Sequence, residues 1–419
     1  MKRILQNLAS VVGGETILRV ANLAAAIAIA RLYGPAVLGL YGACTALVTV
    51  VFMFADGGLQ LSAITEIGSA RERAPWLVGE FYLSKSILCA TAVGFLFAIG
   101  IRKGFPNIYW VIGGFITLRT LIQSYSQLQI AILKSFVTMH LIGIIQAFHS
   151  AVLILGIAVA YVQNWSIVGL LKLLVLGQAL ELFLMTGAVL RIRVRPCWPL
   201  FSSCLGLMRR SVLLGLGYAL ANLIVRLDVV VLSFVVSLPE LGQFSAADNL
   251  LVVAYLASWL FGSVLLPEMV ELSNSPEVLD RFLNRWIRIA YKITVPGALV
   301  VFLIAPRAIT MLYGSDFAHA GALASWIFGA CPFIVFNSLS LHYTIAIGAK
   351  RTYLKTMLFT ALSATALNYS LAHYFGAAGV AAAILIRESL LSVVLWLRHS
   401  RTKAADVEIG ISVSSRGYP

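Results

Sequence analysis

Residues 31–43 read Arg31-Leu-Tyr-Gly-Pro-Ala-Val-Leu-Gly-Leu-Tyr-Gly-Ala43, and residues 237–246 read Ser237-Leu-Pro-Glu-Leu-Gly-Gln-Phe-Ser-Ala246. In both stretches an apolar run ends at a proline turn, and Leu-Gly-x-aromatic-small-Ala opens the next run. Gly39 and Gly242 correspond, 203 residues apart in a chain of 419. We therefore interpret the chain as two related halves, the alternative being that this pattern is simply how helical hairpins turn.

The composition is that of a membrane protein. The chain is 60% hydrophobic and 11% charged, whereas soluble domains are about one-quarter charged. A helix needs roughly 20 apolar residues to cross a bilayer. We predict about twelve such spans, over residues 12–33, 36–56, 77–101, 108–131, 138–162, 166–190, 211–236, 241–266, 287–305, 321–346, 354–375 and 377–398.

The number of spans in each half fixes the symmetry. Six spans return the chain to the side where it began, so the halves should be parallel repeats about an axis along the membrane normal. The predicted fold is an all-α integral membrane protein, with two parallel six-helix bundles around a central cavity. The predicted parts are an N-terminal lobe (1–205), a C-terminal lobe (206–400) and a mobile cytoplasmic tail (401–419).

The basic residues predict the orientation. The net charge is +14, which could suggest nucleic-acid binding, but Lys and Arg cluster in the short segments between apolar runs. With the N-terminus inside, the inner segments hold about twenty basic residues and the outer ones hold Arg102, Lys103 and Arg307. This is the positive-inside pattern. It predicts cytoplasmic termini and no nucleic-acid partner.

Several functional classes lack their sequence signatures. The five cysteines include no CxxC pair, so neither a disulfide framework nor a metal site is predicted. No Gly-rich nucleotide-binding loop or nucleophile elbow occurs. No segment outside the spans is long enough for a catalytic domain. We expect a protein that is not an enzyme and that needs no cofactor.

Charged residues inside the first span of each half are the main candidates for function. An arginine in the hydrocarbon core costs roughly 2.5–3.5 kcal/mol on insertion scales, so it is expected to face a protein-lined polar pathway. In the first span these candidates are Glu15, Arg19 and Asn22, which share a helix face. In the seventh span they are Asn222, Arg226 and Asp228.

In a parallel repeat these two spans would lie across the axis from each other. Arg19, Arg226, Asn22 and Asn222 would then contact an anionic substrate there. The alternative is that Glu15–Arg19 and Arg226–Asp228 are static ion pairs that hold spans together.

Four further charged residues are weaker candidates. Arg119 begins a polar stripe in the fourth span, which could line the cavity or form hydrogen bonds between spans. Arg31 could contact substrate, although snorkelling to the headgroups explains its position equally well. Asp248 could face the cavity beside Arg226, and with Glu15 and Asp228 it could couple to an ion or gate the pathway. Arg387 adjoins Glu388, and only one of the two is expected to face a given cavity.

Two other polar residues lie deep in predicted spans. Glu181 is too deep in the sixth span to dismiss. His149 is one of several lone histidines, for which a satisfied core position is a more common explanation than a proton relay.

The hairpin motifs resemble those of Wzx-type polysaccharide-biosynthesis flippases, which belong to the multidrug/oligosaccharidyl-lipid/polysaccharide (MOP) exporter superfamily. The resemblance covers nearly the whole chain through loose motifs in a consistent order. Besides residues 31–41 and 227–247, these are Leu312-Tyr-Gly-Ser-Asp-Phe317, Gly348-Ala-Lys-Arg351, and Asn368 followed by Phe375-Gly-Ala-Ala-Gly-Val-Ala381. One departure is Gln243-Phe244, where the family has a small or polar residue before tyrosine.

The resemblance implies transport of a polyprenyl-pyrophosphate-linked glycan from the cytoplasmic to the outer face of the inner membrane, driven by an ion gradient. The expected surroundings are the bilayer, this glycolipid, and the glycan polymerase and glycosyltransferases of the same pathway, with the protein as a monomer. A cation-coupled multidrug exporter of the same superfamily is the first alternative. A membrane glycan polymerase or glycosyltransferase is the second.

Overall fold

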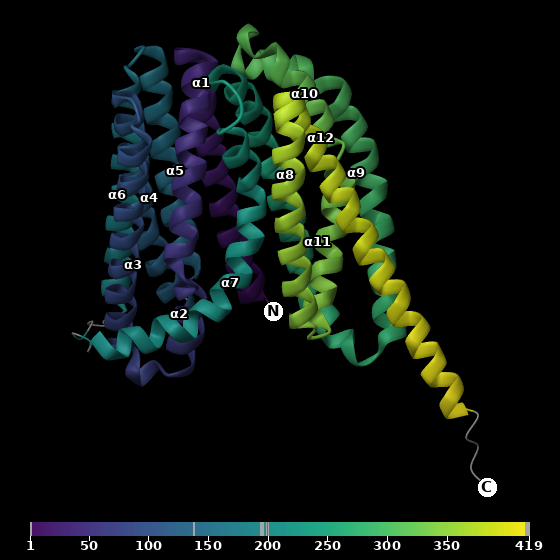
Figure 1. Ribbon diagram of the computed structural model, residues 1–419. Coiled ribbons are helices and arrows are strands. Elements are labelled where there is room, and N and C mark those ends of the chain that lie inside the picture. Colours follow the sequence, from purple (N-terminus) through teal and green to yellow (C-terminus); the bar gives the residue numbers. More distant parts are fainter. Residues whose placement is uncertain (1, 137–138, 193–196, 198, 200, 415–419) are drawn as a thin grey trace.

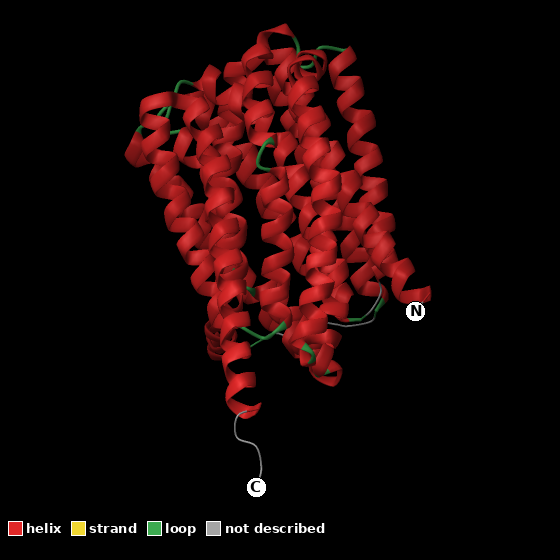
Figure 2. Ribbon diagram, turned by 90° about the vertical axis from the view of Figure 1, so that its right-hand side faces the viewer, coloured by secondary structure: helices red, strands yellow, loops and turns green. Residues whose placement is uncertain are grey.

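The computed structural model describes the chain except for residues 1, 137–138, 193–196, 198, 200 and 415–419 (Figure 1). Every regular element in the described residues is helical (Figure 2). The α-helices of the first half are α1 (Lys2–Asp56), α2 (Leu59–Ser69), α3 (Ala74–Lys103), α4 (Asn107–Ser135), α5 (Met139–Val162) and α6 (Ile167–Arg191). Those of the second half are α7 (Phe201–Leu232), α8 (Leu238–Glu271), α9 (Pro276–Tyr313), α10 (Ala318–Phe328), α11 (Cys331–Ala346) and α12 (Lys350–Ser414). Short 3-10 helices cover Arg71–Arg73, Leu272–Asn274 and Ser315–Phe317.

Two glycines divide the longest helices into separate crossings. Gly34 in α1 has φ 78° and ψ −177°, and Gly376 in α12 has φ 59° and ψ −137°. Side chains with a Cβ avoid these conformations, so glycine allows the chain to reverse there. Each long helix therefore supplies two antiparallel spans.

The order of helices confirms the predicted series of crossings. Segments Thr16–Ser69 and Arg351–Arg398, each with such a reversal, are apolar enough to span a bilayer. In the described residues α3, α5, α6, α8 and α9 also qualify, and α10 with α11 qualifies when the two are taken together across a bend of 43°. α4 and α7 are not among the qualifying helices, and in α4 polar residues such as Arg119, Gln123 and Gln127 interrupt the apolar run.

The spans run up and down between two ends of the molecule. The first turn of α1 and the last turn of α12 lie at one end, which we call the terminal end (Figures 1 and 2). The reversals of α1 and α12 lie at the opposite end, which we call the hairpin end (Figure 1). This alternation is what an even number of crossings in each half requires.

The two copies of the repeated motif pack against each other at the hairpin end. A Cβ on Gly39 would lie 2.0 Å from the carbonyl oxygen of Leu238, and a Cβ on Gly242 would lie 1.9 Å from that of Pro35. Each glycine thus lets its helix approach the start of the other copy. Such a reciprocal contact is what a twofold axis between the halves predicts.

α7 connects the two halves at the terminal end. Its first turns run beneath the first half (Figure 1), where Leu207 packs in a cluster with Leu59 and Val78. A Cβ on Gly215 would lie 2.3 Å from the backbone nitrogen of Gly58, so α7 and the start of α2 are in backbone contact. The later part of α7 packs on α12. The division at residue 205 therefore falls within a helix that contacts both halves.

The last helix extends beyond its final span. α12 continues to Ser414, and residues 415–419 lie outside the described part of the chain. The mobility of the segment from residue 401 onward stays a prediction.

Candidate functional site

Arg119 is the centre of a polar cluster in the first half. Its Nη2 donates to Oδ1 of Asn22 at 2.6 Å, and its Nη1 donates to the hydroxyl of Tyr41 at 3.3 Å. Its Nε is buried and has no hydrogen-bond partner. The structure therefore brings together two predicted substrate residues, Asn22 and Arg119, and it shows that neutral groups hold the guanidinium.

A histidine–glutamate pair lies beside this cluster. His149 Nδ1 on α5 is 3.6 Å from Glu181 Oε2 on α6, and both side chains are almost completely buried. Gln178 Nε2 donates to the same carboxylate oxygen. Arg119 interacts electrostatically with both His149 and Glu181. This pairing was missed in the sequence, where His149 was interpreted as a lone core residue.

The positions of His149 and Glu181 relative to the turn between α5 and α6 could have indicated the pair. His149 and Glu181 are each 16 residues from Trp165, which lies in the turn between α5 and α6. Residues equally far from the turn of an antiparallel hairpin lie at the same depth, because both helices rise by about 1.5 Å per residue.

The second half buries an ion pair between α7 and α12. Arg387 Nη1 lies 2.7 Å from Asp228 Oδ1, with both side chains 1% exposed. Asn368 Nδ2 donates to the same oxygen at 2.7 Å, and Asp228 Oδ2 is buried without a partner. Asp228 therefore has Arg387 as its ion-pair partner, rather than Arg226 as the static-pair alternative proposed.

Glu388 joins the same network. Arg387 Nε donates to Glu388 Oε1 at 3.2 Å, and the Tyr255 hydroxyl donates to that oxygen at 2.8 Å. Asn337 Nδ2 donates to Glu388 Oε2 at 2.8 Å. Although Arg387 and Glu388 are adjacent in sequence, both side chains belong to this one network, because the arginine side chain folds back toward its neighbour. Which of the two faces a cavity stays a prediction.

The other candidates from the repeated spans lie on α1, α7 and α8. Arg19, one turn before Asn22, and Arg226 are both half-buried, and α1 packs against α7. Asp248 is buried on α8 and interacts electrostatically with Arg226, Asp228 and Arg387. The side chains of Glu15 and Asn222 lie outside the described part of the structure.

Arg31 is separate from these clusters. It is exposed at the hairpin end, where its Nε donates to the carbonyl oxygen of Leu312 at 2.7 Å and its Nη2 donates to that of Met311. A cation beside the final carbonyl groups of a helix interacts favourably with the helix dipole. Arg31 thus links α1 to the last turn of α9.

A further buried ion pair, absent from the predicted site, joins α1 and α3. Lys85 is 1% exposed and pairs with Asp56, which also accepts from Gln60 Nε2 at 3.2 Å. Lys85 lies outside every predicted motif, and its partner is 29 residues away in the chain, so no local spacing could have indicated the pair.

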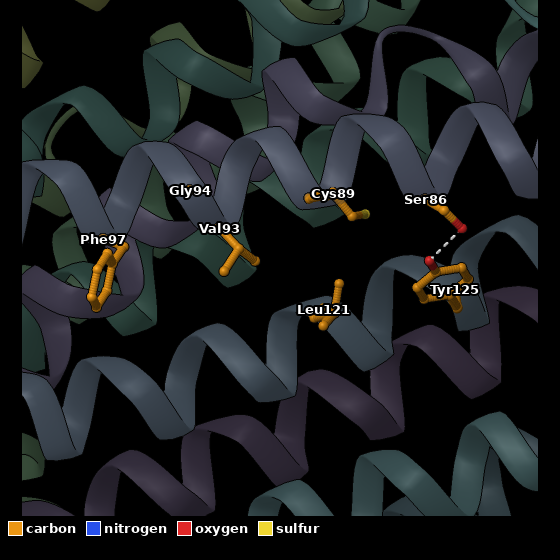
Figure 3. A pocket seen from close by; sticks show the side chains of 8 residues that line it. Ser86, Cys89, Val93, Gly94, Phe97, Leu121 and Tyr125 are labelled. Atoms are coloured by element: carbon orange, nitrogen blue, oxygen red, sulfur yellow. Dashed lines mark hydrogen bonds between the residues drawn. The ribbon is translucent and has the colours of Figure 1, made fainter.

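A groove of about 610 Å³ lies between α3 and α4 (Figure 3). Ser86 and Tyr125 form a hydrogen bond of 2.8 Å at one end, and Phe97 lies at the other (Figure 3). The remaining lining is made of Cys89, Ala90, Val93, Gly94 and Leu121. This apolar lining suits hydrocarbon rather than a charged group, and the groove contains none of the predicted site residues.

Comparison with known families identifies the chain. The profile of the family described as "Polysaccharide biosynthesis protein" matches residues 28–321, which is most of the sequence. The chain belongs to this polysaccharide biosynthesis protein family. The match includes both copies of the hairpin motif, as well as Arg31, Arg119, Arg226, Asp228 and Asp248.

Solved structures show that this family member has the fold of MOP superfamily transporters. An inward-facing multidrug resistance MATE family transporter of that superfamily aligns with a TM-score of 0.77 and 15% identity, over 93% of this chain and 95% of the other. The lipid II flippase MurJ, in an inward closed conformation, aligns with a TM-score of 0.75 and 15% identity, over 92% and 86%. A superfamily transporter from Pyrococcus furiosus gives 0.64 and 16%, over 96% of both chains. No match was found among curated proteins.

The family match and the shared fold confirm the predicted polysaccharide biosynthesis family and the predicted all-α membrane fold. The substrate and the roles of individual residues are the subject of the proposal below.

Proposed function

We propose that this protein is a flippase that moves a polyprenyl-pyrophosphate-linked oligosaccharide from the cytoplasmic to the outer face of a bacterial inner membrane. The main support for this proposal is that arginines lie on spans near the interface of the two halves, in a chain of the polysaccharide biosynthesis family. Arg19 and Arg226 lie half-buried on α1 and α7, which pack together, and Arg119 contacts Asn22 on α1.

The chemistry of the headgroup suits these residues. Guanidinium groups match phosphate oxygens through paired hydrogen bonds and keep their charge at all physiological pH values. Arg19, Arg226 and Arg119 would bind the pyrophosphate, with Asn22 and Asn222 contributing amides. The isoprenoid tail would stay in the bilayer while the headgroup crosses by alternating access.

Ion coupling is assigned to the acidic residues of the second half. Asp228 and Asp248 are buried close to Arg226 and Arg387, so a cation or proton that binds to them would change the charge beside the arginines. Glu15 has the corresponding role in the first half. The buried oxygen of Asp228 that lacks a partner supports the choice of this residue.

The outward face of α9 supports cytoplasmic termini. Arg281, Arg285, Arg288 and Lys292 are exposed at the start of this helix, at intervals that place them on one face. The same face continues toward the hairpin end with exposed Val295, Leu299 and Leu303. Since basic residues favour the cytoplasmic side, the terminal end would be cytoplasmic and the hairpin end would face outward.

We further propose that the protein acts as a monomer beside the glycan polymerase and glycosyltransferases of its pathway. No feature of the described residues favours the multidrug exporter or the membrane enzyme over the flippase.

The test is transport of fluorescent lipid-linked oligosaccharide in proteoliposomes. The Arg19→Ala, Arg226→Ala double variant should lose about tenfold or more of the rate, because each charged hydrogen bond contributes about 1.5–3 kcal/mol. The matched control is Arg102→Ala, Arg307→Ala, which removes two exposed arginines and should leave the rate unchanged. Normal transport by a well-folded first double variant would refute the headgroup assignment. Export of toxic cations instead would favour the multidrug exporter, and glycan synthesis would favour the membrane enzyme.

A further inference from the structure

The pair of His149 and Glu181 has hydrogen-bonding capacity that the protein leaves unused. Both ring nitrogens of His149 and Oε1 of Glu181 are buried and have no hydrogen-bond partner among the described residues. His149 is 0% exposed and Glu181 is 1% exposed. Buried polar atoms are normally satisfied, so several unsatisfied atoms at one place call for an explanation.

The neighbourhood has more atoms of the same kind. Gln146 Oε1 and Ser150 Oγ, on the same helix as His149, are also buried without partners. The ring of His149 lies over Gly177, where a Cβ would be 3.5 Å from Nε2. A histidine and a carboxylate close together in such a place can bind a proton between them, and this would satisfy part of the unused capacity.

The charges around the pair come from the helices packed against α5 and α6. α4 contributes Arg119, and α6 contributes Glu181 itself with the neutral Gln178. α1 contributes Asn22, which is bonded to Arg119. The charged residues of α1 are Lys2, Arg3, Glu15 and Arg19 before Asn22, Arg31 at the hairpin end, and Asp56 at the end of the second crossing, where it pairs with Lys85. α4, which carries Arg119, packs against both α5 and α6, so the pair lies on helices in contact with the helix of a proposed headgroup residue.

We propose that His149 and Glu181 form a proton-binding site within the first half, and that Arg119 sets its proton affinity. By the reciprocity of linkage, an anion bound beside Arg119 changes the proton affinity of the pair by the same factor as protonation changes anion binding. A bound proton reduces the negative charge near Arg119, so protonation and anion binding favour each other. This last step rests on the proposed function, whereas the proton site itself does not.

The test follows the pair directly in the purified protein without substrate. The ring nitrogens of labelled histidine report a proton on His149, and the infrared carbonyl stretch of a protonated carboxyl group reports one on Glu181. The signals are assigned by their loss in His149→Asn and Glu181→Gln. One of them should change between about pH 4 and about pH 9, a range wide enough to include the displacement that burial causes in such groups.

Variants separate a proton site from a purely structural pair. Glu181→Gln should weaken proton binding at His149 by about tenfold or more, since an opposite charge within this distance shifts such equilibria by about that factor. Arg119→Gln should move the same titration the opposite way, because it removes a positive charge. His342 is the matched control: it is buried in the second half, with Nδ1 2.7 Å from the carbonyl oxygen of Ser338, and neither variant should alter its signal.

The results distinguish this proposal from the proposed function. If neither the His149 nor the Glu181 signal changes over this pH range, or if Arg119→Gln leaves the titration in place, the proton site is overturned whatever the protein transports. If the titration behaves as expected but proteoliposomes move no lipid-linked oligosaccharide, the site stands and the flippase proposal fails.

Discussion

Replacing Gly39 with alanine should open the contact between α1 and α8 at the hairpin end. The new Cβ would lie 2.0 Å from the carbonyl oxygen of Leu238 and 2.8 Å from the backbone nitrogen of Gly242. Contacts below 3.0 Å do not occur for real Cβ atoms, so the two helices must separate by about 1 Å. No flexible side chain can move aside, because both contacted atoms belong to the backbone.

The size of the effect follows from the cost of overpacking, which is about 1–3 kcal/mol for one added methyl group. Every 1.4 kcal/mol changes an equilibrium about tenfold, so the packed arrangement should lose between about five- and 150-fold in relative population. Gly242→Ala should act similarly through Pro35. Since the two sites touch, the double variant is not expected to be additive.

A disulfide reports the packed arrangement. A Cβ on Gly42 would lie 3.3 Å from Cβ of Ser245, near the separation of about 3.5–4.5 Å that disulfides need. In a chain without its five natural cysteines, Gly42→Cys, Ser245→Cys should form a crosslink with mild oxidant. The crosslink should also stop transport reversibly if the hairpin end opens to release substrate.

The crosslinking rate should fall about fivefold or more when Gly39→Ala is added. Gly114→Ala is the control, since no atom lies within 4 Å of a Cβ at that exposed position of α4. Equal crosslinking with and without Gly39→Ala would refute the reasoning, because it would mean that the helices accommodate the methyl group in their packed positions.

Three further predictions concern the polar contacts. Asp228→Asn should lower stability by about 1.5–3 kcal/mol, because Arg387 loses one charged contact and keeps Glu388 as a carboxylate partner. The measurement is thermal unfolding in detergent against the exposed Lys172→Met control, and an unchanged unfolding temperature would contradict it. Asn22→Ala should lower stability by about 1.5–3 kcal/mol and reduce the transport rate as Arg119→Ala does. Tyr41→Phe removes the longer hydrogen bond of 3.3 Å and should have a smaller effect on both. A larger effect of Tyr41→Phe would show that Tyr41 orients the guanidinium. Arg31→Ala should lower stability by about 0.3–1 kcal/mol by removing a cation from the end of α9, and should leave transport within about twofold; loss of transport would return Arg31 to the substrate site.

The sequence predicted the features that depend on local pattern. Span length and apolarity follow from the bilayer, and the turns at Gly34-Pro35 and Pro239 follow from backbone chemistry, so the order of crossings was predicted well. The correspondence of Gly39 and Gly242 also led to the two halves. The contact between the two glycines could be seen only in the three-dimensional structure.

The polar clusters were harder to predict because their partners are far apart in the chain. The static-pair alternative joined Asp228 to Arg226, two residues away, but its ion-pair partner Arg387 is 159 residues away on α12. Sequence spacing favours neighbours on one helix, whereas a buried charge takes whichever partner compensates the loss of water. His149 and Glu181 lie on adjacent helices, so counting residues from their turn would have found them.

The arrangement also separates the arginines that began as equivalent candidates. The guanidinium of Arg387 is bonded to Asp228 and Glu388, so its charge is already compensated, and an anion could bind it only by displacing a carboxylate. The guanidinium of Arg119 is bonded to an amide and a phenol, which leave its positive charge in place. A pyrophosphate gains more from a cation that is bonded to neutral groups than from one already bonded to carboxylates. We therefore infer that Arg387 stabilises the second half and its ion response, and that the first half, through Arg119, provides the stronger attraction for the headgroup.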